Sequence, residues 1–161
     1  MKRNARHILG LSLTRPWPFA FVNGPEEMRK RVENRSWPPP QSAIGQYLAL
    51  HAAQSWSEDD HDWIEELTGL IVPSRAESPH SIIFAVCRLV GYVEKVSDER
   101  LSDEQSQWFF GPFGWLFDEF VKLVEPVPCK GARKLWSFEK RQSELHALRL
   151  SYRKSVAAPK F

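Results

Sequence analysis

The sequence predicts an α+β fold built on a small, mostly antiparallel β-barrel or curled sheet. Short apolar and alternating runs recur along the chain and predict strands, and two or three other stretches have the apolar spacing of helices. The length of 161 residues, with 42% hydrophobic and 26% charged residues, is typical of one globular domain. We therefore expect a single domain over residues 1–161, with a core of about 7–150 and a tail at 151–161.

The N-terminal third predicts a strand, a turn and a short helix, followed by a charged, proline-rich segment. Residues 8–13 alternate in the manner of a strand, and Pro16 can begin a helix at 17–22 that ends at Asn23 and Gly24. The segment 25–40 contains three successive prolines, which lack an amide donor. That segment must be a loop or an edge strand.

The middle of the chain predicts two buried strands around an acidic helix. A compact apolar strand covers 47–53, and the serines at 55–57 offer an N-cap for a helix that stops near Gly69. The long β-branched and apolar run at 81–96 suits a buried strand that bends at Gly91.

The C-terminal third predicts further strands and a closing helix. An aromatic cluster and an alternating segment at 120–127 suggest two strands that flank a Gly-Pro turn. From Leu135 onward, Phe138, Leu145 and Leu148 continue a roughly helical apolar spacing with a basic outer face.

Charge is segregated along the chain, although the formal net charge is only +2. The first fifteen residues and the stretch 130–154 are basic, whereas 58–66 carries six carboxylates and no Lys or Arg. The N-terminal basic residues are Lys2, Arg3, Arg6 and Arg15. If the two ends meet, they form one positive face suited to a phosphate backbone, and otherwise they are solvated tails.

Several classes of protein are excluded by the composition. No run approaches the roughly 20 apolar residues of a membrane span, and the basic N-terminus makes a poor signal peptide, so we expect a cytoplasmic protein with no membrane contact. Cys87 and Cys129 have no Cys or His at a metal-ligand spacing, so we predict neither a metal nor a cofactor. Cys87 lies in an apolar run and is interpreted as a core residue.

Four blocks of the sequence together resemble the ASCH domains, a branch of the PUA-like superfamily. They are LSLTRPWPFAFVNG, the Lys30, Glu33 and Arg35 of KRVENRSW, LALHA, and GWLFDEFVKLVEPVPCKGARKLW. The second block matches the Lys, Glu and Arg of the family signature G-x-K-x-x-E-x-R, whereas its Gly is absent because Gly24 lies too far upstream.

The resemblance implies a PUA-like barrel with two to four flanking helices and a cleft beside the signature loop. It also implies binding of RNA, since that is what most relatives do. Some relatives hydrolyse an amide on an acetylated cytidine, and some cleave RNA. In the amidohydrolases a Thr nucleophile lies three residues after the Lys, and Glu33 occupies that position here, so a hydroxyl would have to come from Ser12, Thr14 or Ser36.

The charged trio of Lys30, Glu33 and Arg35 supplies the main candidate site residues. Lys30 in a partly apolar cleft would lose charge stabilisation and act as a general base or hold phosphate, or else it is an exposed loop lysine. Glu33 would accept a hydrogen bond from a base amine, or form a structural ion pair. Arg35 would bind phosphate or stack on a ring, or tie the loop to backbone carbonyls.

Three tryptophans complete the predicted cleft. Trp17, Trp37 and Trp115 would form an aromatic wall for an unstacked base, or pack in the core or a lid. Ser12 and Arg15, at the end of the first strand, are assigned to the same binding surface. Trp136 is instead predicted to lie in the core.

Two further residues are candidates for phosphate and proton chemistry. His51 ends an apolar strand and would either carry a proton in the cleft or form a structural hydrogen bond. With Lys30 it would supply the minimum apparatus for metal-free RNA cleavage. Lys130, beside Gly131, would grip phosphate or belong to a solvated basic turn.

Three functions remain open from the sequence. The leading one is a binding module for RNA or a modified nucleoside or nucleotide, with an aromatic, basic cleft. The second is a metal-independent hydrolase, either a ribonuclease that uses Lys30 and His51 or a nucleoside amidohydrolase. The third is a protein-binding regulator whose acidic middle recruits a basic partner.

Overall fold

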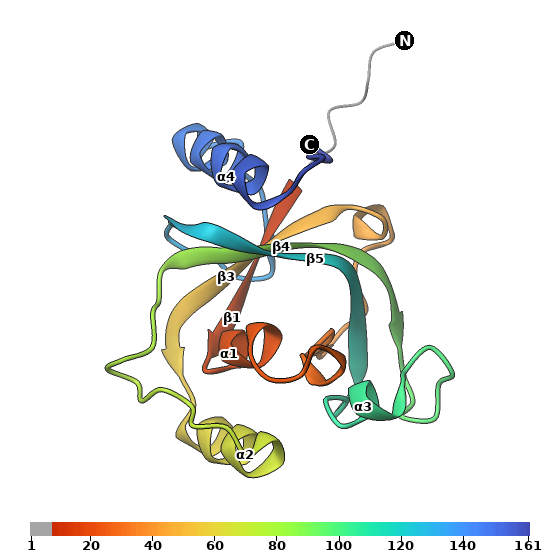
Figure 1. Ribbon diagram of the computed structural model, residues 1–161. Helices are drawn as coiled ribbons and strands as arrows, with labels where there is room; N and C mark the ends of the chain where they lie inside the picture. Colours follow the sequence, from red (N-terminus) through yellow and green to blue (C-terminus); the bar gives the residue numbers. More distant parts are fainter. Residues whose placement is uncertain (1–7) are drawn as a thin grey trace.

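The computed structural model describes residues 8–161 and contains six strands and four α-helices within them (Figure 1). The predicted basic residues Lys2, Arg3 and Arg6 lie outside the described residues. The elements in chain order are β1 Ile8–Arg15, α1 Trp17–Val22, β2 Val32–Arg35, β3 Tyr47–Trp56, α2 Glu58–Thr68, β4 Ile82–Val93, α3 Asp103–Ser106, β5 Phe113–Pro128, β6 Leu135–Trp136 and α4 Gln142–Ser155, with short 3-10 turns at Glu26–Met28 and Gln41–Ala43.

The six strands form one mixed sheet in the order β2-β5-β4-β3-β1-β6. The β1–β3 pair is parallel, and the other four pairs are antiparallel. The predicted α+β class and the mostly antiparallel sheet are therefore confirmed. The barrel is not confirmed, because the hydrogen-bonded ladder of the described strands ends at β2 on one side and at β6 on the other.

Side-chain contacts link the two ends of this open ladder. Arg35, the last residue of β2, donates from Nη2 to the carbonyl oxygen of Ser12 in β1 over 3.1 Å. Just beyond β2, the Trp37 ring lies 5.5 Å from Nζ of Lys134, which immediately precedes β6. The sheet is thus curled enough for its first and last strands to approach each other.

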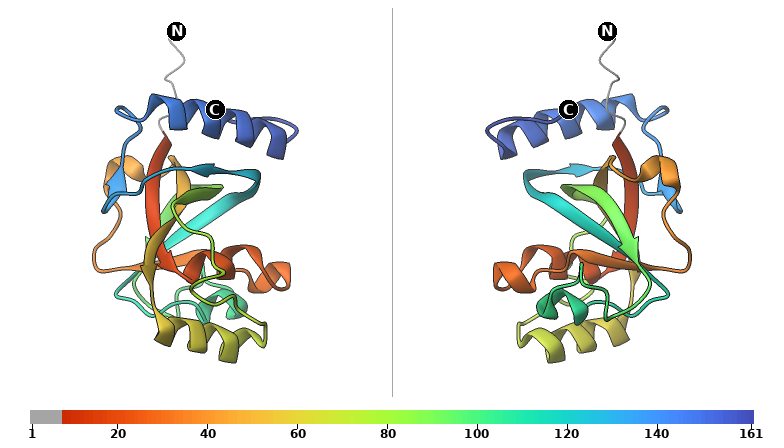
Figure 2. Two further views of the ribbon diagram at one scale, coloured as in Figure 1. Left: turned by 90° about the vertical axis from the view of Figure 1, so that its left-hand side faces the viewer. Right: turned by 90° about the vertical axis from the view of Figure 1, so that its right-hand side faces the viewer.

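The two faces of the sheet have separate hydrophobic cores. On the concave face, Leu11 and Leu50 pack with Phe21 of α1 and with Trp115 of β5. On the opposite face, a second cluster joins the sheet to Leu148 and other residues of α4. Figures 1 and 2 show α4 lying across one side of the sheet, with α1 on the other.

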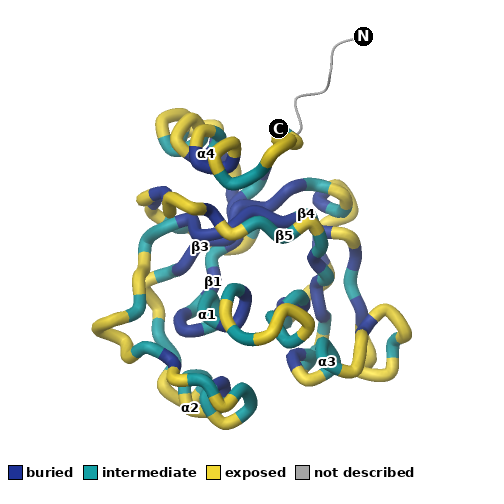
Figure 3. Tube along the Cα trace, in the orientation of Figure 1, coloured by how far each residue is buried: buried dark blue, intermediate teal, exposed yellow. Residues whose placement is uncertain are grey.

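Local signals account for several helix and strand boundaries. Ser57 caps α2 by accepting a hydrogen bond from the amide of Asp60, and Gly69 ends the helix in the left-handed conformation with φ of 68°. Both ends of this helix confirm the sequence prediction. The deeply buried segments lie along the central strands, while the loops around α2 and α3 are largely exposed (Figure 3).

Other boundaries differ from the predictions. The closing helix begins at Gln142 rather than near Leu135, because Leu135 and Trp136 pair with β1 as strand β6. The Gly-Pro turn precedes the single long strand β5 and follows α3, so it does not separate two strands. α4 continues beyond residue 150, and residues 151–155 belong to it rather than to a tail.

Trp136 is 6% exposed and confirms the prediction of a core tryptophan. Within the described residues, no helix is both long and apolar enough to cross a membrane.

The contact between β1 and β6 leads to a stability prediction. A Cβ atom at Gly10 would lie 2.2 Å from the nearest ring atom of Trp136, which is closer than atoms can pack. We expect Gly10→Ala to lower the free energy of unfolding by about 1–3 kcal/mol through overpacking, measured by urea denaturation. In a Trp136→Leu background the same change should cost clearly less, and an equal cost in both backgrounds would contradict the proposed clash.

Candidate functional site

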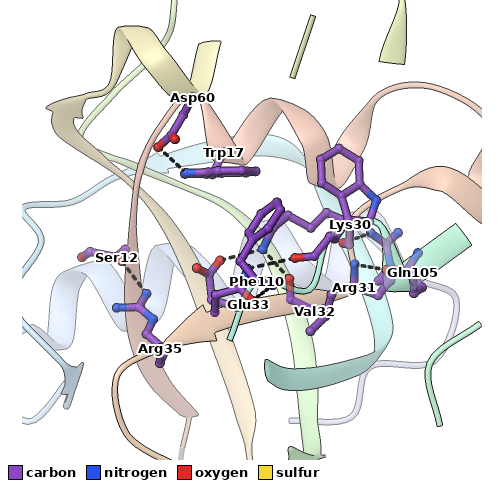
Figure 4. A network of polar contacts seen from close by, with 12 residues as sticks. Ser12, Trp17, Lys30, Arg31, Val32, Glu33, Arg35, Asp60, Gln105 and Phe110 are labelled. Atoms are coloured by element: carbon purple, nitrogen blue, oxygen red, sulfur yellow. Dashed lines mark hydrogen bonds and ion pairs between the residues drawn. The ribbon is translucent and has the colours of Figure 1, made fainter. Parts of the chain in front are cut away.

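Strand β2 places the charged trio on the inside of the curled sheet. Glu33 and Arg35 are two residues apart on this strand, so their side chains extend from the same face, and they pair in register with Trp115 and Phe113 of β5. Figure 4 shows both side chains on the side of β2 where Trp17 lies. Lys30 enters the same space from the segment immediately before β2.

Lys30 is a buried lysine with a complete set of contacts. Its side chain is only 1% exposed, and Nζ donates hydrogen bonds to the carbonyl oxygen of Val32 and, over 3.2 Å, to Oε2 of Glu33. The ammonium also lies 4.9 Å from the Phe21 ring and 5.3 Å from the Trp17 ring. Burial lowers the pKa of Lys30, and the Glu33 carboxylate opposes that shift.

Two atoms of the trio keep unused hydrogen-bonding capacity. Glu33 binds Lys30 through Oε2, while Oε1 has no partner among the described residues, and the side chain stays 11% exposed. In Arg35, Nε is the only buried side-chain nitrogen or oxygen without a partner in the described part of the chain. A free acceptor and a free donor therefore lie two residues apart on one strand face.

An aromatic cluster encloses the site opposite β2. Trp17 contacts Trp63, Trp108 and Phe110, with ring centroids 6.1, 6.3 and 6.1 Å away. The indole nitrogen of Trp17 donates to Asp60 of α2 over 2.9 Å, which fixes the orientation of the ring (Figure 4). Phe110 remains 52% exposed, so this aromatic wall continues to the protein surface.

Asn34 holds the loop that carries Phe110, and neither residue was predicted to belong to the site. Its Nδ2 donates to the carbonyl oxygen of Trp108, and its Oδ1 accepts from the amides of Phe110 and Gly111. Asn34 sits between Glu33 and Arg35 with its side chain on the other face of the strand. Asn34 is adjacent to the charged trio, and Phe110 lies in the aromatic-rich segment WFFGPFGW. The contact between Asn34 and this segment joins residues that are far apart in the sequence, so it could not be predicted from either signal.

Trp37 and Trp115 occupy different environments. Trp115 is buried in the concave core, with the guanidinium carbon of Arg35 6.0 Å from its ring centroid. Its indole nitrogen donates to the backbone carbonyl of Trp37. Trp37 itself is 46% exposed at the rim beside Lys134. Trp17 therefore lies beside Lys30 of the trio, Trp115 packs beneath Arg35, and Trp37 lies at the exposed rim.

Arg15, predicted as a ligand-binding residue, has a framework role. Its guanidinium donates to four backbone carbonyl oxygens, those of Ala53, Gln54, Arg75 and Ser78. These bonds tie the end of β1 to the end of β3 and to the loop after α2. Because its donors are engaged by the fold, Arg15 has little capacity left for a ligand.

His51 does not join Lys30. The His51 ring lies edge-on to Trp136, 5.9 Å away, and Trp136 belongs to the core under α4, whereas Lys30 contacts Phe21 in the concave core. Ser12, the register partner of His51, bonds to His51 Nδ1 through its hydroxyl. The structure thus replaces the expected Lys30–His51 pair with a Ser12–His51 pair.

Lys130 lies with this second group. It lines a pocket of about 630 Å³ together with Ser12, His51 and Arg133. The trio and Lys130 thus belong to different groups, and the hydrogen bond from Arg35 to the Ser12 carbonyl links the two.

One group of possible metal ligands occurs within residues 8–161, namely Glu58, His61 and Asp62 on α2. Both ring nitrogens of His61 already face acceptors, Nδ1 at Asp62 and Nε2 at the carbonyl oxygen of Val72. The hydrogen bond to Asp62 raises the pKa of His61, which favours the protonated ring without a lone pair for a metal.

No family model matches the chain, and no curated protein is significantly similar to it. The similar solved structures include an ASCH protein from Zymomonas mobilis, with 16% identity, and a mutant ZmASCH protein from the same organism, with 17%. Each has a TM-score of 0.48, and each alignment covers 89% of this chain and 96% of the other. Both carry the name of the family that the sequence resembles. At this TM-score and identity, the similarity assigns no role to any residue of this chain.

The buried lysine leads to a pH prediction. Because burial lowers its pKa in the folded state, Lys30 binds its proton less tightly there than in the unfolded chain, where the value is about 10.5. At pH values between the folded-state pKa and the unfolded-state pKa of Lys30, the unfolded state holds more protons, so the free energy of unfolding should rise with pH.

The reference protein for this pH dependence is the double variant Lys30→Met/Glu33→Gln, which removes both charges of the pair and leaves no unpaired ion. Denaturation in urea from pH 7 to 10.5 should show wild-type stability rising relative to this variant. Parallel curves would mean that the pKa of Lys30 is not lowered by folding.

Proposed function

We propose that this chain binds a nucleobase of single-stranded or flipped-out RNA, or of a modified nucleoside, in the pocket between Trp17 and the Glu33–Arg35 face of β2. One observation carries the proposal: Glu33 Oε1, an acceptor, and Arg35 Nε, a buried donor, have no partner within residues 8–161 and lie on the same face of one strand beside an aromatic wall. A base edge offers a donor and an acceptor side by side, and its ring offers a face to stack.

Energetics favour a ligand at these two atoms. A buried charged donor without a partner costs about 1–3 kcal/mol or more, and a ligand acceptor at Arg35 Nε would recover that free energy. A stacking contact on an aromatic side chain adds about 1–3 kcal/mol for each base. The rigid support of Trp17 by Asp60 and of Glu33 by Lys30 would reduce the entropy lost on binding.

We further propose that the curled sheet functions as a PUA-like barrel whose open edge is bridged by side chains. The hydrogen bond from Arg35 to Ser12 and the contact of Lys134 with Trp37 supply the closure that backbone pairing does not. Lys134 at the rim would meet the phosphate backbone that leaves the pocket.

Binding is tested with a ten-nucleotide, mixed-sequence single-stranded RNA and with the free nucleosides cytidine, guanosine and N4-acetylcytidine. Glu33→Gln removes the negative acceptor, and Arg35→Lys removes the Nε donor but keeps the charge. Each should weaken binding of the RNA by about tenfold or more, the usual effect of losing a hydrogen bond to a charged group. Isothermal titration calorimetry and quenching of tryptophan fluorescence measure the affinity.

Glu27→Gln, an exposed change in the turn before Lys30, is the matched control and should bind as wild type does. Circular dichroism verifies folding of every variant. Wild-type affinity should fall as salt rises, because phosphate contacts release counterions. The proposal fails if wild type binds none of these ligands, or if both site variants bind as tightly as Glu27→Gln.

Hydrolysis in the same pocket is a second candidate, favoured by the lowered pKa of the buried Lys30. Once it has lost its proton, the Lys30 amine would act as a general base toward an amide on a bound base, and a lowered pKa makes that loss easier. With excess chelator present, N4-acetylcytidine or RNA should then yield product by mass spectrometry. Lys30→Met/Glu33→Gln should yield no product. If wild type binds these ligands but forms no product, hydrolysis is ruled out and only the binding function stands.

A further inference from the structure

Ser12 and His51 form a hydrogen-bonded pair outside the proposed base pocket. They face each other in the parallel register of β1 and β3, and Ser12 Oγ lies 3.0 Å from His51 Nδ1. The other ring nitrogen, Nε2, lies 2.7 Å from the carbonyl oxygen of Cys129. A serine, an imidazole and an orienting acceptor are thus aligned in one chain of hydrogen bonds.

The acceptor at Cys129 decides which nitrogen of His51 carries the proton. A carbonyl oxygen can only accept, so Nε2 must be the donor, and in the neutral ring Nδ1 then holds a lone pair. The Ser12 hydroxyl therefore donates to Nδ1. His51 is 2% exposed, and burial lowers its pKa, with the nearby Arg141 acting in the same direction, so the neutral ring is favoured at neutral pH.

The pair opens onto a pocket rather than being sealed in the core. Ser12 and His51 both line the cavity of about 630 Å³, whose rim includes Lys130 and Arg133. Gly131 passes so close that a Cβ there would lie 2.6 Å from Ser12 Oγ and 2.5 Å from His51 Cε1. A side chain at this position would therefore collide with both members of the pair.

We propose that Ser12 is a nucleophile activated by His51, and that it accepts the acyl group of an ester bearing a negative charge. The lining residues of the pocket include Lys130 and Arg133 and no Asp or Glu, which favours an anionic substrate. The indole nitrogen of Trp136 donates to Ser12 Oγ over 3.2 Å and stabilises negative charge on that oxygen.

The reaction follows from the hydrogen bonds. Ser12 Oγ attacks the ester carbonyl carbon while its proton passes to His51 Nδ1, and the imidazolium is stabilised by the Nε2 bond to Cys129. The bond from the acyl carbon to the leaving oxygen then breaks, and Nδ1 returns the proton to that oxygen. Water attacks the acyl-Ser12 ester, gives a proton to Nδ1, and releases the carboxylic acid as Ser12 takes the proton back.

The test uses a fluorophosphonate probe on the full chain. Reaction forms a bond from Ser12 Oγ to phosphorus, breaks the P–F bond and releases fluoride, with the hydroxyl proton taken by His51. Intact-mass spectrometry should show one adduct, and peptide mapping should place it on Ser12. Ser12→Ala should give no adduct, His51→Gln should label at least tenfold more slowly, and Ser55→Ala, a change at an exposed serine, should label as wild type does.

Two measurements on the wild-type protein test the proposal without any variant. The labelling rate should fall as pH decreases, with its midpoint below the ordinary imidazole pKa of 6.5. The charged groups around His51 that set this profile are Arg141, Lys130 and Arg133, together with the Cys129 thiol, whose pKa burial raises. An anionic ester, 4-nitrophenyl hemisuccinate, should also be cleaved faster than neutral 4-nitrophenyl butyrate.

The proposal is overturned if wild type gains no adduct on Ser12, or if folded His51→Gln labels at the wild-type rate. Preference for the neutral ester would overturn its assignment to anionic substrates. Labelling needs no nucleobase, and Glu33→Gln and Arg35→Lys retain Ser12 and His51. The outcome is therefore separable from that of the binding experiment.

Discussion

The burial of one ammonium group, that of Lys30, governs the arrangement of the concave side of the molecule. An amine removed from water needs strong acceptors, and it finds them in the Val32 carbonyl and the Glu33 carboxylate, both in β2. The rings of Phe21 and Trp17 complete its surroundings, so α1 and β2 must lie at fixed positions around it. The same pair orients the Glu33 carboxylate, whose other oxygen has no partner within residues 8–161.

The short edge strand β2 meets this requirement through contacts outside the sheet. It pairs with β5 along one edge, while Arg35 reaches across to β1 and Asn34 holds the loop with Phe110. These side chains replace the backbone pairing that a closed barrel would supply at β2. The open edge of the ladder at β2 is therefore bridged by side chains rather than by backbone hydrogen bonds.

The sequence predicted those features that depend on local signals. The capped helix α2, the strand β4 and the edge character of the segment around β2 follow from Ser57, Gly69, β-branched runs and prolines. It failed where a long-range contact overrode a local pattern, as at Leu135, whose helical spacing gives way to pairing with β1. The trio was found by resemblance, but its unpaired atoms, and the partners Asn34 and Asp60, exist only through contacts between distant segments.

Ser12 shows why the predicted site separated into two. On a strand, the backbone lies between two faces, and here the Ser12 carbonyl meets Arg35 while its hydroxyl meets His51. The sequence cannot reveal such a division, because Lys30, Ser12 and His51 all lie on or next to strands of one sheet and the sequence does not show which face each side chain takes. The position of β1 is fixed from both sides by these bonds, so the geometry of each pocket depends on the same strand. A distortion of β1 would therefore disturb the base pocket and the serine–histidine pair together, whereas changes at Glu33 or at Gly131 act on one alone.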